Sequence, residues 1–454
     1  MLKKLFGNKS FYKSVFKVTL PIMIQQLLIN VVSLVDNLMV GQLDENVISG
    51  VYIASKILFV INMALFGAIE GASVFFAQFF GSKDEKHLKQ CFNFKLYADT
   101  FVSIIGMVIL LFFSRPIAEL FVNSEQALIA SNYLKIYAIC LIPFILTNVF
   151  GTCYREVNKS FVPMIGSLLA LFINITLNYV FIFALGLGYK GAAIATVIAR
   201  FSECSFIIVY SIITKPMFVQ NVFKHFKIDL PLAKNVFIKS LPLFLNEICW
   251  ATGQIMLIFA YSKVSETAAP ALSISQTLFD VFYLANIALG NGIAVIMGNT
   301  LGANNLKEAK KQITYFMTLA IMLAILMGGV LAITGPQLSK IYNVSDASRH
   351  LAIMLIVYNV VLMPIFSTNC AMFFMIRSGG FTAIVLIFDS VFSWLIQVPL
   401  ALILAYKSSL TLPTQFLIVN LAELIKLGVG IILLKSGIWI KNLTMDEKIL
   451  EVSK

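Results

Sequence analysis

Charged residues are scarce in this chain. Asp, Glu, Lys and Arg make up 12% of its 454 residues, whereas soluble globular domains contain about 25%. Hydrophobic residues make up 59%, and the mean hydropathy is +0.90. So few charges could not cover the surface of a soluble fold of this size. The composition therefore excludes that class and predicts a polytopic membrane protein.

Residues that commonly build catalytic or metal sites are also few. The six cysteines show no C-x-x-C spacing and the three histidines form no i, i+4 pair, so neither a disulfide framework nor a zinc site is indicated. Neither H-E-x-x-H nor G-x-S-x-G occurs. The one G-x-G-x-x-G, formed by Gly186, Gly188 and Gly191, follows no strand, and we interpret it as a tight extracellular turn. We expect no enzymatic activity, no catalytic residue and no cofactor.

Long apolar runs dominate what is present. About 20 helical residues cross roughly 30 Å of hydrocarbon, and twelve runs reach that length. We therefore predict an all-α fold with twelve transmembrane helices. The runs lie near residues 18–40, 48–80, 92–113, 132–153, 161–186, 191–213, 239–262, 268–300, 313–334, 350–375, 382–406 and 413–435.

The basic residues indicate which side of the membrane each loop faces. The net charge of +12 could suggest a nucleic-acid partner, but roughly 24 of the 34 Lys and Arg fall in loops on the side of the N-terminus and roughly 7 on the other side. This pattern predicts a multi-pass protein of the plasma (cytoplasmic) membrane with both termini cytoplasmic, and no nucleic-acid partner. The first run lacks an A-x-A-like cleavage site, so we expect an uncleaved first span.

The chain contains an internal repeat with a spacing of 221 residues (242 − 21 = 221). The pairs that match at this spacing are Pro21 and Pro242, Gly81 and Gly302, and Pro143 and Pro364. Each copy holds six spans, an even number, so the two copies have the same orientation in the membrane. We predict an N-lobe of residues 1–213, a cytoplasmic linker of residues 214–238, and a C-lobe of residues 239–454 that ends in a short cytoplasmic tail.

One acidic side chain, Asp36, lies inside the first apolar run. Placing a carboxylate there costs about 2.5 to 3.5 kcal/mol, and no Lys or Arg lies within two turns of it on the same helix. Two interpretations are open. Asp36 is either a protonated or hydrogen-bonded packing residue, or a group that binds a coupling ion or the substrate. We favour the second, because a buried acid is rarely kept without a partner or a function.

Helix geometry places other oxygen-bearing side chains at the depth of Asp36. At 1.5 Å per residue, Asp36 lies about 8 Å from the outer end of its span, Asn178 about 12 Å and Thr196 about 9 Å. Asn174 lies one turn from Asn178 on the same helix face. Hard oxygen ligands suit Na⁺, and a carboxylate in a poorly solvated pocket suits H⁺ exchange. The predicted ion-coupling site, which would hold Na⁺ or H⁺, consists of Asp36, Asn174, Asn178 and Thr196.

Other charged residues within the spans have partners close by in the sequence. Arg200 with Glu203 in the sixth span, and Glu423 with Lys426 in the twelfth, are i, i+3 pairs that can neutralise each other, so we interpret both as structural. Four further residues receive no interpretation, because long helices could place them in water near an interface. They are Lys56, Glu70, Asp99 and Asp280.

The second half of the chain does not repeat Asp36, because the equivalent position is Leu257. It carries instead Glu247 in the seventh span and Asp389 in the eleventh, with no basic residue within one turn of either. We predict that these two acids line a substrate cavity that attracts cations. The alternative is that both are buried, hydrogen-bonded carboxyl groups.

Six stretches of the chain form an ordered set of motifs. They are the span from Pro21 to the closing VG at residues 40–41, AQFFGSKD (77–84), FINITLN (172–178), GLGYKGAAIAT (186–196), GNTLGANN (298–305) and RSGG (377–380). In this order they resemble the multidrug and toxin extrusion (MATE) transporters of the bacterial DinF and NorM kind, and the resemblance covers essentially the whole chain.

The resemblance implies a two-lobe secondary antiporter that exports organic, often cationic, compounds by alternating access in exchange for Na⁺ or H⁺. The family's ion site falls on the four residues grouped above by depth. Many bacterial members carry a second Asp where this chain has Asn178, so the coupling ion and its stoichiometry stay open. The glutamate that NorM-like members carry in the seventh span falls on Trp250, so Glu247 takes no role from the family.

One alternative within transport is a flippase or exporter of a lipid-linked or polyanionic substrate. That function predicts a basic cavity, whereas Asp36, Glu247 and Asp389 are acidic. A receptor or scaffold would not explain a buried acid inside a repeated twelve-span chain. We therefore expect small organic cations as substrates, membrane lipids as neighbours and no obligate protein partner.

Overall fold

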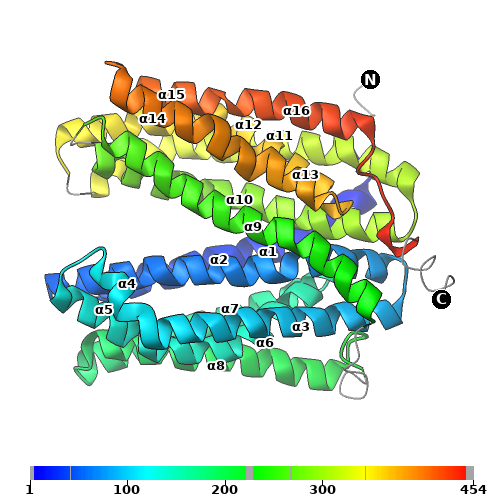
Figure 1. Ribbon diagram of the computed structural model, residues 1–454, viewed down its shortest axis with the longest axis horizontal. Helices are drawn as coiled ribbons and strands as arrows, with labels where there is room; N and C mark the ends of the chain where they lie inside the picture. Colours follow the sequence, from blue (N-terminus) through cyan, green and yellow to red (C-terminus); the bar gives the residue numbers. More distant parts are fainter. Residues whose placement is uncertain (1–4, 41, 221–228, 266–267, 343, 446–454) are drawn as a thin grey trace. The chain divides into compact units, whose positions relative to one another are not determined.

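The computed structural model describes residues 5–40, 42–220, 229–265, 268–342 and 344–445. All regular structure in these residues is helical (Figure 1). Twelve helices or series of helices are long and apolar enough to cross a membrane. The predicted all-α fold with twelve spans is confirmed.

The first six spans use eight α-helices with three short irregular segments. They are α1 (Lys9–Val40); α2 (Glu45–Gly81); α3 (Glu85–Val108), η2 (Ile109–Phe113) and α4 (Ser114–Glu119); α5 (Ser124–Tyr137), η3 (Ala138–Cys140) and α6 (Leu141–Glu156); α7 (Phe161–Asn178) and η4 (Tyr179–Ala184); and α8 (Gly188–Thr214).

The last six spans also use eight α-helices with three short π- or 3₁₀-helical segments, although the interruptions are distributed differently among the spans. They are α9 (Leu230–Ser262); α10 (Ala268–Gly302); α11 (Leu306–Leu338) and η6 (Ser339–Ile341); α12 (Asp346–Ser378); α13 (Thr382–Leu386), η7 (Ile387–Val391), η8 (Ser393–Gln397) and α14 (Val398–Lys407); and α15 (Leu412–Leu421) and α16 (Glu423–Ser436).

Short π- and 3₁₀-helical segments interrupt several spans. The 3₁₀ segment η3 ends three residues before Pro143, and the π segment η8 ends two residues before Pro399. Proline lacks a backbone N–H and clashes with the preceding turn, which disturbs the regular hydrogen-bond ladder there. The π segment η4 begins directly after Asn178 and η7 contains Asp389. Such segments are frequent near functional sites.

The repeat is visible in the backbone. Lys83 and Asn304, which match at the 221-residue spacing, are both left-handed, with φ of 58° and 57°. The next residue in each copy caps the following helix, since Asp84 and Asn305 each accept a hydrogen bond from the backbone N–H three residues later, at 3.2 and 3.3 Å. Equivalent residues therefore end one helix and begin the next in the same way.

The helices form two compact units. One contains Leu20–Phe244, and the other contains Met1–Thr19 together with Leu245–Lys454. Both boundaries fall inside helices, α1 and α9, close to Pro21 and Pro242. The compact units thus differ from the predicted lobes. Residues 1–19 group with Leu245–Lys454, whereas the predicted linker and residues 239–244 group with the first six spans. The functional division into residues 1–213, 214–238 and 239–454 stays a prediction.

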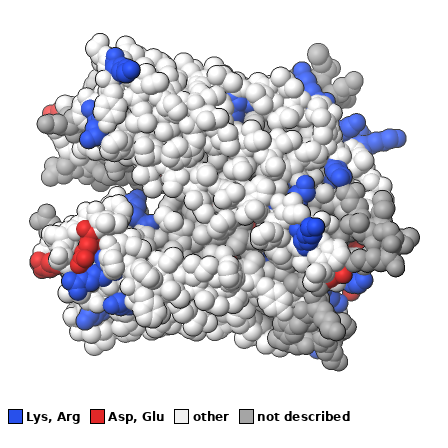
Figure 2. Space-filling model, viewed as in Figure 1, with Lys and Arg blue, Asp and Glu red and all other residues white. Residues whose placement is uncertain are grey.

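Each unit has its own apolar core. Leu65 and Leu134 are inaccessible in the Leu20–Phe244 unit, as are Leu331 and Met363 in the other. On the face that Figure 2 shows, charged side chains gather toward the helix ends, and few lie along the middles of the helices. This distribution leaves an apolar band that suits the hydrocarbon of a bilayer.

Candidate functional site

Three helices of the Leu20–Phe244 unit bring the four predicted ion-site residues together. The side-chain amide of Asn178, on α7, donates to a carboxylate oxygen of Asp36 on α1. The same amide donates to the side-chain oxygen of Asn174, one turn earlier, at 3.1 Å. The amide of Asn174 donates to the hydroxyl of Thr196 on α8 at 3.3 Å. One chain of hydrogen bonds therefore links the carboxylate to all three neutral residues.

The Asn178 side chain is saturated as a donor but not as an acceptor. Both of its amide hydrogens are used, whereas its buried carbonyl oxygen accepts no hydrogen bond from the part of the chain that the structure describes. Such a group costs about 1 to 3 kcal/mol. A Na⁺ ion beside this oxygen, or a proton on Asp36 donated to it, would satisfy it. The residues present thus fit one added positive charge.

Tyr133 belongs to the same region, although the sequence did not single it out. It lies on α5, is 6% exposed and stacks on Tyr137 with ring centroids 6.4 Å apart. The helix α5 packs against α8, which carries Thr196. A tyrosine in an apolar span looks like an ordinary aromatic packing residue, so nothing in the sequence alone would have distinguished it.

A second polar chain lies next to the candidate ion site. Arg200 donates to Glu203 at 2.9 Å, which confirms the predicted pairing of these two residues. Glu203 also accepts from the Ser167 hydroxyl at 2.7 Å, and Ser167 accepts from the Gln25 amide at 3.1 Å. Arg155 donates to the Gln25 side-chain oxygen at 3.0 Å. The first, fourth, fifth and sixth spans are thereby joined through polar side chains.

Two buried polar pairs join α3 to α6. Lys95 lies 2.6 Å from Glu156, with 0% of the lysine side chain exposed. Asp99, one turn after Lys95, accepts from the Asn148 amide at 3.2 Å and is inaccessible to solvent. Asp99, which the sequence left without an interpretation, is therefore buried rather than placed in water near an interface. Both acids have polar partners on the neighbouring helix.

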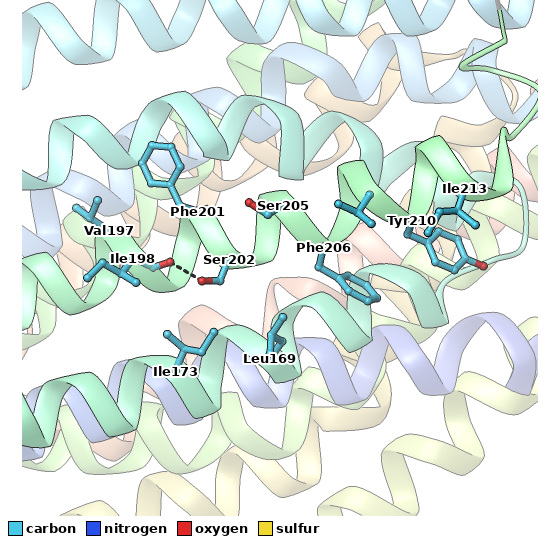
Figure 3. Close-up of a pocket in the computed structure, with 11 residues that line it drawn as sticks. Leu169, Ile173, Val197, Ile198, Phe201, Ser202, Ser205, Phe206, Tyr210 and Ile213 are labelled. Carbon is cyan, nitrogen blue, oxygen red and sulfur yellow. Dashed lines mark hydrogen bonds between the residues drawn. The ribbon is translucent and has the colours of Figure 1, made fainter.

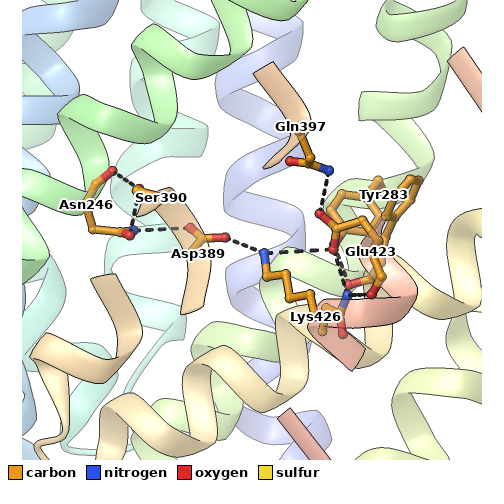
Figure 4. A network of polar contacts seen from close by, with 9 residues as sticks. Asn246, Tyr283, Asp389, Ser390, Gln397, Glu423 and Lys426 are labelled. Carbon is orange, nitrogen blue, oxygen red and sulfur yellow. Dashed lines mark hydrogen bonds and ion pairs between the residues drawn. The ribbon is translucent and has the colours of Figure 1, made fainter. Parts of the chain in front are cut away.

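Asp389 has a cation beside it that comes from another span, so local sequence spacing could not reveal it. Lys426 lies 2.6 Å from Asp389 and 3.9 Å from Glu423 (Figure 4). The sequence favoured the neighbour at i−3, but the packing of α16 against η7 brings Asp389 closer. The other Asp389 oxygen accepts from the Asn246 amide at 3.3 Å. Asp389 is therefore a paired, hydrogen-bonded carboxylate, and its contact with a substrate stays a prediction.

A groove among the described residues is lined by neither Glu247 nor Asp389, and the predicted substrate cavity stays a prediction. Glu247 is half-buried on α9 and takes part in polar contacts, and its contact with a substrate stays a prediction. The groove has a volume of about 700 Å³ and lies between α7 and α8 (Figure 3). Apart from Ser202, Ser205 and Tyr210 its lining side chains are apolar, and many are exposed. It belongs to the apolar surface of the helices.

Within the described ranges, no group of three or more His, Cys, Asp or Glu could hold a metal ion. A cation at the candidate site would instead be held by one carboxylate with amide and hydroxyl oxygens. Such oxygens suit a monovalent, hard cation.

Twelve apolar spans, a repeated backbone and buried polar chains within the spans define a polytopic membrane transporter. The MatE family model matches residues 21–180 and 242–403 of the chain, one match in each half. The chain therefore belongs to the MatE family, and the resemblance drawn from its motifs is confirmed.

Similar proteins and structures support membership of this family. The chain is 25% identical to the multidrug export protein MepA of Staphylococcus haemolyticus over 74% of its own length and 75% of that protein. It is 26% identical to a probable multidrug resistance protein NorM of Bacillus anthracis, over 85% and 86% of the two lengths. A crystal structure of a MATE protein in complex with MaL6 has the same fold, with a TM-score of 0.87 at 17% identity, over 96% and 97% of the two chains.

Proposed function

We propose that this protein is a secondary antiporter that exports small organic cations from the cell in exchange for inward Na⁺ or H⁺. The relatives named as multidrug export and multidrug resistance proteins support efflux of small molecules. The observation that carries the coupling part is the hydrogen-bonded chain from Asp36 to Thr196, with its single carboxylate.

The coupling rests on one unit of charge. Asp36 is negative and its hydrogen-bond partner Asn178 is neutral, so one bound cation or proton neutralises the site. A ligand changes the population of two conformations by as much as its affinity for them differs. A site that binds a cation from outside and releases it inside would therefore drive alternating access of the two lobes.

The same proposal includes the setting of the protein. We place it in the plasma membrane with both termini cytoplasmic, on the strength of the excess of Lys and Arg in alternate loops. Membrane lipids surround its apolar surface, and the exchange of substrate and ion needs no obligate protein partner.

The test is efflux from proteoliposomes that contain the purified protein. A fluorescent organic cation is loaded inside, and either an inward Na⁺ gradient or an inward pH gradient is imposed. We expect one of the two gradients to accelerate efflux at least several-fold over vesicles without a gradient. Equal efflux under all three conditions would refute ion-coupled antiport.

The rival transport function is the flipping or export of a lipid-linked or polyanionic substrate. Lys426 neutralises Asp389, so this acid does not count against an anionic substrate. Movement of such a substrate in the same vesicles, without movement of organic cations, would favour the rival.

A further inference from the structure

A cluster of polar side chains lies inside the unit that contains residues 245–454 (Figure 4). Five helical segments contribute to it. The cluster consists of Asn246 on α9, Asn369 on α12, Asp389 on η7, Gln397 on η8, and Glu423 and Lys426 on α16. The exposed fractions of the Lys426, Glu423 and Asp389 side chains are only 10%, 11% and 18%.

The Lys426 ammonium occupies the middle of this cluster. It lies 2.6 Å from one Asp389 oxygen, 3.9 Å from one Glu423 oxygen and 5.2 Å from the centre of the Phe388 ring. Two carboxylates and an aromatic face are the surroundings that a bound cation prefers. The ammonium is thus held as a free monovalent cation would be held.

Neutral donors hold the two carboxylates in place around the ammonium. The Asn246 amide donates to Asp389 at 3.3 Å. Glu423 accepts from the amides of Asn369 at 2.7 Å and Gln397 at 3.0 Å. Positions of the acids are therefore fixed by groups other than the lysine, so the carboxylates would stay close together without it.

The cluster has more negative than positive charge. Asp389 and Glu423 carry two formal negative charges and Lys426 carries one positive charge. Within the described residues, Tyr283 and Cys370 also face the cluster, and phenol and thiol side chains are uncharged at neutral pH. Loss of the ammonium would leave two largely buried carboxylates unneutralised, which strongly favours uptake of another cation.

The corresponding part of the other unit is arranged differently. The 221-residue spacing matches Gln25 to Asn246, and one residue beyond that spacing matches Ser167 to Asp389. Ser167 donates to Glu203, which Arg200 neutralises, and Arg155 donates to Gln25, so that network contains one acid and two bases and no second carboxylate. Among the residues that the structure describes, the network around Ser167 has no counterpart of the paired acids Asp389 and Glu423.

We infer that Asp389 and Glu423 form a site for one monovalent cation, whose resident cation is the tethered ammonium of Lys426. Sodium-sized alkali cations are the class of free ligand that would replace it. A consequence, which rests on the proposed function, is that this unit carries its cation covalently and does not exchange it during transport.

The test is the thermal stability of Lys426→Met in detergent, measured in NaCl and in choline chloride at equal ionic strength. All proteins carry Asp36→Asn as well, so the proposed coupling site contributes no Na⁺ effect. We expect Lys426→Met to melt several degrees lower than its Asp36→Asn parent in choline chloride, and NaCl to restore most of the loss along a saturable curve. The parent should respond little to NaCl, and Lys426→Arg should behave like the parent.

Two controls separate a cation site from a structural ion pair. Adding Asp389→Asn to Lys426→Met should abolish the response to NaCl. Lys95→Met is the second control, because Lys95 also lies 2.6 Å from a carboxylate but pairs with one acid, Glu156, and not with two. The stability of Lys95→Met should therefore fall without recovery in NaCl.

The inference is overturned if Lys426→Met shows no saturable stabilisation by NaCl, or if Lys95→Met shows an equal one. Where Lys426→Met fails to fold in choline chloride, Lys426→Gln is purified in parallel in NaCl and in choline chloride, and equal yields of folded protein in the two salts also overturn the inference. These measurements need no transport, so they are independent of whether the ion-coupled efflux proposed above is correct.

Discussion

Replacing Asp36 with Asn removes the one formal charge of the candidate ion site and keeps the size of the side chain. A cation about 4 Å from a carboxylate gains about 4 kcal/mol at an effective dielectric constant of 20. Since 1.4 kcal/mol corresponds to a factor of ten, binding of the coupling ion should weaken by about 10³-fold. We therefore expect gradient-driven efflux by the Asp36→Asn protein to fall to the level of empty vesicles.

Stability should respond far less than transport. The side-chain oxygen of the new asparagine can still accept the hydrogen bond from Asn178, and the substitution removes a charge that is costly to keep in an apolar span. We expect the free energy of unfolding to change by less than about 1 kcal/mol. A small change in melting temperature together with lost efflux would separate a coupling role from a packing role.

The assay compares Asp36→Asn with Asp280→Asn in proteoliposomes of equal protein content. Asp280 is an exposed residue on α10 that accepts from the Gln276 amide at 2.7 Å, and its substitution is the same chemical change outside the candidate site. Asp280→Asn should transport like the wild type. Folded Asp36→Asn protein with wild-type efflux would refute the assignment of Asp36 to ion coupling.

Three further substitutions test particular parts of the structure. Asn178→Asp places a second carboxylate beside the first. If Na⁺ couples, the substitution should tighten Na⁺ binding and slow Na⁺ release; if H⁺ couples, it should move the pH optimum of transport upward, because a proton is held more firmly between two acids. Efflux measured from about pH 5.5 to 8.5 with and without Na⁺ distinguishes these results, and unchanged profiles would exclude Asn178 from the site. Lys95→Met leaves the buried Glu156 without its ammonium and should destabilise the protein by about 3 to 5 kcal/mol in denaturant unfolding, whereas a neutral effect would contradict a buried ion pair. Gly71→Ala introduces a Cβ that would clash with the side-chain oxygen and the Cα of Ser240 on α9, and it should cost about 1 to 3 kcal/mol of stability. Gly329→Ala, whose Cβ would have no heavy atom within 4 Å, should cost little. Equal melting temperatures for these two variants would refute the close approach of α2 and α9.

The features that the sequence predicted well depend on one helix at a time. A span is recognised because about 20 apolar residues in a row suffice to cross a bilayer, whatever their neighbours are. The rise of 1.5 Å per residue likewise gives the depth of a side chain within its own helix. Depth alone grouped Asp36 with Asn178 and Thr196, and the structure joins these residues by hydrogen bonds through Asn174.

The features that the sequence did not predict depend on which sides of two helices pack against each other. Lys426 has an acid at i−3 on its own helix, so sequence spacing favoured Glu423, but Asp389 on another span lies closer. Asp99 was left open because depth within a long helix does not say whether the side chain meets water or α6. Hydrophobic periodicity gives little help here, since membrane helices are apolar on the lipid side as well as on the packed side.

The repeat constrains the backbone more tightly than it constrains the charges. Lys83 and Asn304 differ chemically but make the same left-handed turn, because the turn requires a positive φ and not a particular side chain. A buried acid is kept only where something neutralises it, and the two halves differ in what does so. Asp36 has neutral donors around it, which leaves room for a mobile cation, whereas Asp389 has the ammonium of Lys426. If both proposals hold, the unit that contains Asp36 alone sets how many ions move with each substrate molecule.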